Sequence, residues 1–199
     1  MENKMFCFQC EQTAGCSGCT GKVGVCGKNA DVAALQDKLT GELIGLVRVT
    51  GDVVPTGNIL KLIIEGLFTT LTNVSFNEQT LNELIEKVRA ERERLVPQCF
   101  ACASPCGTNN EYDLSHIWTD NEDIRSLKSL ILFGIRGMAA YAYHAMVLGY
   151  TNDEVSHFFV KALFALGEDW EMDKLLPIVM ELGKVNLVCM ETVSYTHLR

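Results

Sequence analysis

The stretch CFQCEQTAGCSGCTGKVGVC occupies residues 7–26 and holds five of the nine cysteines in this 199-residue chain. Several glycines separate these cysteines, and glycine lets a backbone bend tightly enough to bring N–H groups near sulfur. The N-terminus, MENKMFCFQC, lacks an apolar run of signal-peptide length, so we expect a cytoplasmic protein. In that reducing compartment disulfides are rare, and clustered thiols indicate metal binding or redox chemistry.

The composition argues against two classes of partner. Hydrophobic residues make up 48% of the chain, enough for a core without disulfide staples, and the net charge is −8. Because the chain has no basic stripe, we do not expect nucleic acid as a partner. The most apolar stretch, residues 130–150, contains Arg136 and His144 near its middle, which favours a buried helix over a membrane span.

Beyond the cysteines, apolar residues recur at three- and four-residue steps, which predicts an all-α fold. Three Ser/Thr-x-x-Glu capping boxes mark expected helix starts, namely Ser75 with Glu78, Thr119 with Glu122, and Thr151 with Glu154. The six predicted helices span about residues 30–50, 58–71, 77–95, 120–149, 152–167 and 170–182. Pro177 must either kink the last helix or mark a late start, and Gly183 should end it.

The cysteine spacing by itself leaves the cofactor open. Cys7 with Cys10, and Cys16 with Cys19, form two C-x2-C pairs, and Cys26 stands further on. Iron–sulfur clusters are held by four cysteine thiolates from such loops, and structural zinc uses the same chemistry. Free or redox-active thiols are the third interpretation.

The order of residues adds a resemblance. The stretches MFCFQCEQTAG and GCTGKVGVCGK, the Leu35-Gln36-Asp37 triplet, CASPCG at 102–107 and MELGKVNLVCM at 180–190 resemble the hybrid cluster proteins. This family is also known as the prismane proteins or hydroxylamine reductases. The resemblance extends to about Glu191 and covers nearly the whole chain.

The resemblance implies a ligand set. Carried over residue by residue, the cluster ligands are Cys7, Cys10, Cys19 and Cys26, with Cys16 as a spare thiol. Eight residues separate Cys10 from Cys19, and family members with that gap carry a [4Fe–4S] cluster, while those with a longer gap can carry [2Fe–2S]. We therefore expect [4Fe–4S], with [2Fe–2S] as the alternative.

The resemblance also implies the architecture. It suggests an all-α portion in which a cysteine-rich cluster-binding loop precedes two three-helix bundles. The expected segments are a loop at 1–28, bundles at 29–96 and 121–191 and a connecting loop at 97–120, and we suspect a non-native tail at 192–199, which does not continue the helical pattern. In the family two α/β domains follow, and the hybrid iron–sulfur–oxygen cluster that performs the chemistry lies among the three domains.

The implied activity of the full-length enzyme is reductive. Electrons from an external donor or partner reductase enter at the N-terminal cluster, and hydroxylamine takes two electrons and two protons to give ammonia and water. Nitric oxide reduction is a rival role for the same family. The present chain would transfer electrons and be inactive alone. A zinc-binding helical interaction module without redox activity is the alternative from another class.

Other residues are expected to be structural. The connecting loop carries Cys99, Cys102 and Cys106, for which we favour a structural role over a second metal site. Cys189 should be a packed thiol. His144 should lie in the core or a groove, while Gly134 and Gly137 could allow close helix approach. Trp118, Trp170, Phe158 and Phe159 should belong to the core rather than form an electron relay.

Overall fold

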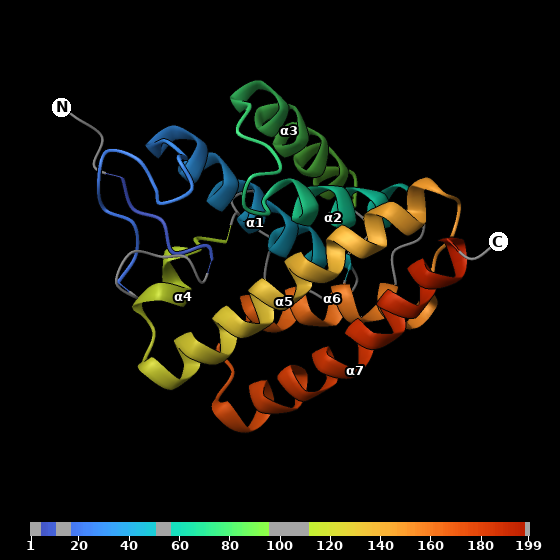
Figure 1. The fold of residues 1–199 in the computed structure, drawn as a ribbon. Helices are drawn as coiled ribbons and strands as arrows, with labels where there is room; N and C mark the ends of the chain where they lie inside the picture. The colour runs from blue at the N-terminus through green and yellow to red at the C-terminus, as the bar shows by residue number, and fades with distance from the viewer. Residues whose placement is uncertain (1–4, 11–16, 51–56, 96–111, 198–199) are drawn as a thin grey trace.

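The computed structural model describes residues 5–10, 17–50, 57–95 and 112–197. All seven regular elements among these residues are helices, which confirms the predicted all-α fold (Figure 1). Their bounds are α1 Ala30–Thr50, α2 Asn58–Thr69, α3 Glu78–Leu95, α4 Ser115–Thr119, α5 Glu122–Val147, α6 Asp153–Gly167 and α7 Met172–His197. The cysteine segment lies at one end of the helical body, beside α4 and the first turns of α1 (Figure 1).

The helix starts differ from the predicted capping boxes in a consistent way. Asn121 caps α5 by accepting a hydrogen bond from the N–H of Ile124, and Asn152 caps α6 by accepting one from Val155. Asn77 accepts from the N–H of Thr80 at the start of α3. Asparagine is at least as good an N-cap as serine or threonine, so the cap falls one or two residues after the predicted one.

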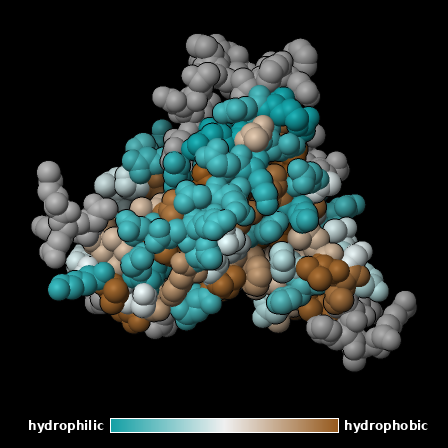
Figure 2. Space-filling view, turned by 90° about the horizontal axis from the view of Figure 1, so that it is seen from above, coloured by the Kyte–Doolittle hydropathy of each residue, from teal (hydrophilic) through white to brown (hydrophobic). Residues whose placement is uncertain are grey.

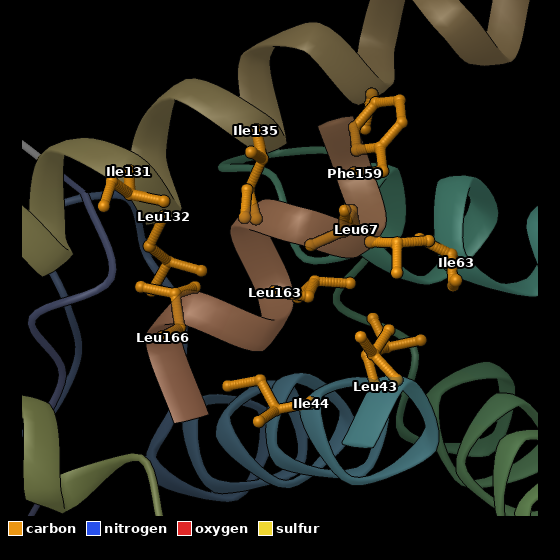
Figure 3. Packing of buried hydrophobic residues seen from close by; sticks show 14 of the residues in the cluster. Leu43, Ile44, Ile63, Leu67, Ile131, Leu132, Ile135, Phe159, Leu163 and Leu166 are labelled. Carbon is orange, nitrogen blue, oxygen red and sulfur yellow. The ribbon is translucent and has the colours of Figure 1, made fainter. Parts of the chain in front are cut away.

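Helix α1 is the centre of the fold. From Leu39 to Val47 its residues are buried on every side, because α3 packs on one flank and α6 on another. Figure 3 shows α6 between α5 and α1, with side chains from four helices interdigitating. The labelled residues are Leu43 and Ile44 from α1, Ile63 and Leu67 from α2, Ile131, Leu132 and Ile135 from α5, and Phe159, Leu163 and Leu166 from α6. One hydrophobic cluster therefore unites the two predicted groups of helices.

Helix α7 corrects the sequence prediction most clearly. The predicted end at Leu182 is wrong, because the helix continues through Gly183 to His197. Val185 and Cys189 are buried and extend the inward stripe of Leu175 and Ile178, so packing outweighs the roughly 1 kcal/mol propensity cost of an internal glycine. Pro177 lies inside the helix and neither ends it nor starts it. The expectation that the tail does not continue the helix is likewise wrong as far as residue 197.

A short helix also lies in the predicted connecting loop. Helix α4 occupies Ser115–Thr119, and the hydroxyl of Thr119 donates to the carbonyl of Ser115 instead of capping α5. The remainder of that loop, with Cys99, Cys102 and Cys106, lies outside the described residues, as do Cys16 and the predicted stop at Gly51 and Pro55.

Helix α5 is, among the described residues, the one helix long and apolar enough to cross a membrane by length and composition alone. A core helix passes the same test, and α5 packs against α2, α6 and α7. A Cβ placed on Gly134 would clash with Leu182 Cδ2, so this glycine permits the close approach of α7, as predicted. Gly137 does not serve that purpose, since nothing described lies within 4 Å of its added Cβ.

Helix α3 is amphipathic, and its charged face looks to solvent. Figure 2, viewed from above Figure 1, faces this side of the molecule and shows a mostly hydrophilic surface. The opposite face of α3 carries an ion pair into the core, where Arg89 and Arg92 contact Glu42 of α1. The Glu42 side chain is 0% exposed, and Arg89 Nη2 lies 2.8 Å from its Oε1. Sequence analysis did not anticipate this buried cluster.

The remaining structural predictions are mostly confirmed. Phe158 and Phe159 are buried, and Trp118 and Trp170 pack partly buried against the same core. Cys189 is a packed thiol whose Sγ donates to the carbonyl of Met138, and burial raises the pKa of its thiol to about 11. The prediction for His144 is wrong, because its side chain is exposed and its ring packs edge-on to Phe68.

Candidate metal centre

Cys7 and Cys19 are paired through their backbones. The N–H of Cys7 donates to the carbonyl of Cys19 at 3.1 Å, and the N–H of Cys19 donates to the carbonyl of Cys7 at 2.7 Å. Both side chains are buried and share a small apolar cluster with Met5 and Ala33. The bridge thus joins the two arms of the cysteine stretch, which are twelve positions apart in sequence.

The bridge depends on a glycine next to it. Gly18 has φ of +90°, in the left-handed region that favours glycine, and an added Cβ would lie 2.8 Å from the Phe6 ring. Glycine at this position therefore lets the second arm turn directly before Cys19.

Cys26 lies in a tight turn just beyond the bridge. Gly24 donates its N–H to the carbonyl of Lys28, and Gly27 donates to the carbonyl of Gly24. Cys26 is half-buried, and a Cβ on Gly24 would lie at ordinary contact distance, 3.6 Å, from its sulfur but only 3.1 Å from Met5 Cε, so this glycine leaves room chiefly for Met5. Cys10, also half-buried, follows Gln9 at the end of the first arm.

Lys28 is a buried cation beside these thiols. Its side chain is 3% exposed, and its ammonium donates to Gln9 Oε1 at 2.9 Å and to Cys7 Sγ at 3.8 Å. Within the described residues no carboxylate lies within ion-pairing distance of its ammonium, and a buried charge is costly unless it is paired. The site therefore offers positive charge where thiolates would be held.

Gln9 links the first arm to two helices. Its side-chain amide donates to the carbonyl of Ala33 and to the carboxylate of Asp37, both in α1. Its backbone carbonyl accepts a 2.9 Å hydrogen bond from Arg136 of α5, whose other terminal nitrogen donates to the Thr40 hydroxyl. These bonds fix the chain between Cys7 and Cys10 against the helical body.

Burial governs the ionisation of this network. It raises the pKa of the Cys7 thiol, an effect opposed by the positive charge of Lys28 and by a hydrogen bond from the N–H of Gln9. Burial also raises the pKa of Asp37 to about 6, and it lowers that of Arg136 to about 10. The positive charge of Lys28 therefore offsets only part of the effect of burial, and the pKa of the Cys7 thiol stays above its ordinary value.

Aromatic side chains anchor the outer side of the arm. Phe6 and Phe8 pack against each other and both contact Trp118 of α4, with ring centroids 4.9–5.9 Å apart. Arg125 of α5 lies over the Trp118 ring at 5.1 Å. The first cysteine arm therefore packs against Trp118, and α4 positions this tryptophan.

The four predicted ligands are all described, and the structure brings them together only in part. No group of three or more His, Cys, Asp or Glu side chains in the described ranges converges closely enough to hold a metal ion. The donor set still suits an iron–sulfur cluster, since four thiols lie on two joined arms beside a buried cation. The fit rests on this chemistry and on these surroundings.

Sequence analysis missed most of the residues that support the thiols. Lys28 follows Cys26 in the Cys-Gly-Lys motif, and Asp37 belongs to the Leu-Gln-Asp triplet. Both motifs were recognised, but no function was predicted for either residue. Arg136 served only to argue against a membrane span. Its contact with Gln9 spans 127 positions in sequence, and no local pattern could have found it.

Comparisons with known proteins agree with the resemblance. The family described as the Prismane/CO dehydrogenase family matches residues 5–197, six residues beyond the predicted limit at Glu191. Proteins named hydroxylamine reductase from Clostridium novyi (strain NT) and Methanocaldococcus jannaschii are 36% and 39% identical to the chain, each over 90% of its length. One from Maridesulfovibrio salexigens is 36% identical over 96% of the chain.

The matches cover only part of these relatives. The aligned region is 36% of the Clostridium and Methanocaldococcus proteins and 38% of the Maridesulfovibrio protein. The chain therefore spans less than half the length of the curated relatives it matches.

Proposed function

The chain belongs to the Prismane/CO dehydrogenase family, and from this premise we propose that it is the electron-entry portion of a hydroxylamine reductase. The observation that carries the proposal is the Cys7–Cys19 backbone bridge next to the buried ammonium of Lys28. It supports a single centre to which thiols from both arms contribute.

We assign Cys7, Cys10, Cys19 and Cys26 as the ligands of one iron–sulfur cluster. The eight-residue gap between Cys10 and Cys19 supports [4Fe–4S], with [2Fe–2S] as the alternative. When bound, such a cluster accepts and releases one electron at a time. Cys16 takes no part in this ligand set.

The protein's own residues hold and insulate the thiols. The Cys7–Cys19 bridge fixes the two arms, Gln9 and Arg136 tie the first arm to α1 and α5, and Phe8 with Trp118 excludes water from its outer side. Burial and hydrogen bonds of this kind help to set a cluster's reduction potential. The half-buried sulfurs of Cys10 and Cys26 suit exchange of electrons with an external donor.

The full-length enzyme is proposed to reduce hydroxylamine to ammonia and water, at a hybrid cluster whose ligands lie in sequence beyond this portion. A cytoplasmic location and an external donor or partner reductase belong to the same proposal. An exposed apolar stripe along α7 supports packing against further domains, and it comprises Met172, Leu176, Met180, Leu187 and Met190.

Anaerobic purification followed by iron, sulfide and zinc analysis tests the proposal. We expect a brown protein with about four irons and four sulfides per chain, as a Cys-ligated [4Fe–4S] cluster requires. Replacing Cys26 by Ser should abolish the cluster, whereas Cys16→Ser, in the same stretch, should keep it. A colourless protein with one zinc would favour the zinc-binding module, and a cluster retained without Cys26 would refute the ligand set.

A further inference from the structure

We propose that Lys28 is the buried counter-charge of the cluster and that it stabilises the cluster's reduced form. This inference rests on the proposed function, since it presupposes a cluster at the four cysteines. It concerns a residue that is not a ligand and that acts only through the ligand sulfurs.

Three observations single out Lys28. Its ammonium is buried, it donates directly to Cys7 Sγ at 3.8 Å, and its other acceptor is the neutral amide oxygen of Gln9. Elsewhere in the described chain, the buried Lys128 ammonium lies 3.6 Å from a carboxylate oxygen of Asp120. Lys28 differs because, among the described residues, no carboxylate lies within ion-pairing distance of it. Burial raises the pKa of Asp37 and the charge of Lys28 opposes this rise, but the Asp37 carboxylate is hydrogen-bonded by Gln9. The anion-forming group that Lys28 contacts directly is the Cys7 sulfur.

Gln9 holds this lysine in place. Its Oε1 accepts from Lys28, while its Nε2 donates to the carbonyl of Ala33, so the amide orientation is fixed from both sides. Arg136 in turn donates to the Gln9 carbonyl. The lysine is therefore presented to Cys7 by a network that spans α1 and α5.

The consequence for reduction follows from charge. When an external donor supplies one electron, the cluster and its four thiolates gain one negative charge, and no bond to Lys28 forms or breaks. A fixed positive charge in a buried site interacts more strongly with the more negative state. An N–H donor to the ligand sulfur acts in the same direction. Lys28 should therefore raise the reduction potential.

The test is an anaerobic redox titration of the 199-residue chain, with the reduced cluster followed by electron paramagnetic resonance. In Lys28→Met we expect about a tenfold lower ratio of reduced to oxidised cluster at the wild-type midpoint, or about 59 mV for one electron. Lys22→Met is the matched control, because Lys22 is an exposed lysine of the same loop. Its ratio should change by less than about twofold, since exposed charges are screened.

Lys28→Arg keeps the charge and should assemble a cluster with a ratio within about threefold of wild type. If Lys28→Met loses the cluster while Lys28→Arg keeps it, the requirement for charge is supported. Loss in both, or equal shifts in Lys28→Met and Lys22→Met, would overturn the inference. So would an unchanged ratio in Lys28→Met, which leaves the proposed function standing, whereas absence of iron and sulfide from the wild-type chain would remove the proposed function itself.

Discussion

Two buried charged clusters in this protein differ in how they are neutralised. Inside the helical body, Glu42 of α1 forms ion pairs with Arg89 and Arg92 of α3, so its charge is neutralised by residues of the chain itself. Under the cysteine segment, Lys28 meets the Cys7 sulfur and an amide oxygen instead. The first cluster is complete within the described chain, whereas the second is suited to negative charge from a bound group.

Packing shows the same contrast along one helix. On α5, Gly134 faces α7 with no room for a methyl group. Gly137, one turn further on, borders a cavity of about 240 Å³ that is also lined by Cys10, Gln9 and Arg136. The helical body is thus tightly filled, and the cysteine region is more open. Substitutions in the helical body and in the cysteine region test this difference.

The largest loss of stability is expected in the ion cluster of Glu42, Arg89 and Arg92. Glu42→Gln leaves the buried Arg92 without its partner, and loss of one member of a buried ion pair costs about 3–5 kcal/mol in the free energy of unfolding. Urea unfolding followed by circular dichroism measures it. The control Glu181→Gln removes an exposed partner of Lys161 and should cost less than about 1 kcal/mol. Equal losses in the two variants would contradict the assignment of Glu42 as a structural charge.

A smaller loss is expected where the two regions meet. Arg136→Met removes hydrogen bonds to the Gln9 carbonyl and the Thr40 hydroxyl, and bonds to a charged group contribute about 1.5–3 kcal/mol. It should also speed the loss of iron to a chelator, because the arm between Cys7 and Cys10 loses its tie to α5. Arg48→Met, at an exposed ion pair with Glu168, is the control and should change neither quantity appreciably. Unchanged iron release in Arg136→Met would show that the tie does not stabilise the site.

The two glycines of α5 test the packing contrast. Gly134→Ala should destabilise the protein by about 1–2 kcal/mol, because Leu182 must move and overpacking outweighs the gain in helix propensity. Gly137→Ala should stabilise it by up to about 1 kcal/mol, since its added methyl group meets nothing described within 4 Å. Thermal unfolding midpoints of the two variants should therefore shift in opposite directions. Midpoint shifts of the same sign would show that the packing around Gly134 and around Gly137 does not differ in this way.

The smallest effect on stability is expected at Lys28 itself. In the chain stripped of iron, Lys28→Met removes a buried cation that has no carboxylate partner among the described residues, so the free energy of unfolding should change by less than about 1 kcal/mol or rise. Urea unfolding of the iron-free wild type and variant gives the comparison. A loss as large as that in Glu42→Gln would mean that Lys28 is a structural charge and that the two clusters are alike.

The sequence alone predicted the helical class and most of the helices, because their apolar periodicity is a local property. It predicted the helix ends less well. The Asn121 and Asn152 caps lie two residues and one residue after the predicted threonines, and either residue type can accept from a free N–H. The continuation of α7 could have been found, since Val185 and Cys189 keep the three- and four-residue spacing across Gly183.

The family and the candidate ligands could be predicted from the sequence, since the cysteines and their characteristic neighbours follow one another within one short stretch. The ligand set remains a prediction to be tested by iron content. The surroundings of the thiols, in contrast, become visible in the folded chain alone. Lys28 approaches Cys7 across 21 positions, and Arg136 approaches Gln9 across 127. The first contact arises from the folding of the cysteine segment back on itself at the Cys7–Cys19 bridge, and the second from the position of α5 beside that segment; no local pattern encodes either.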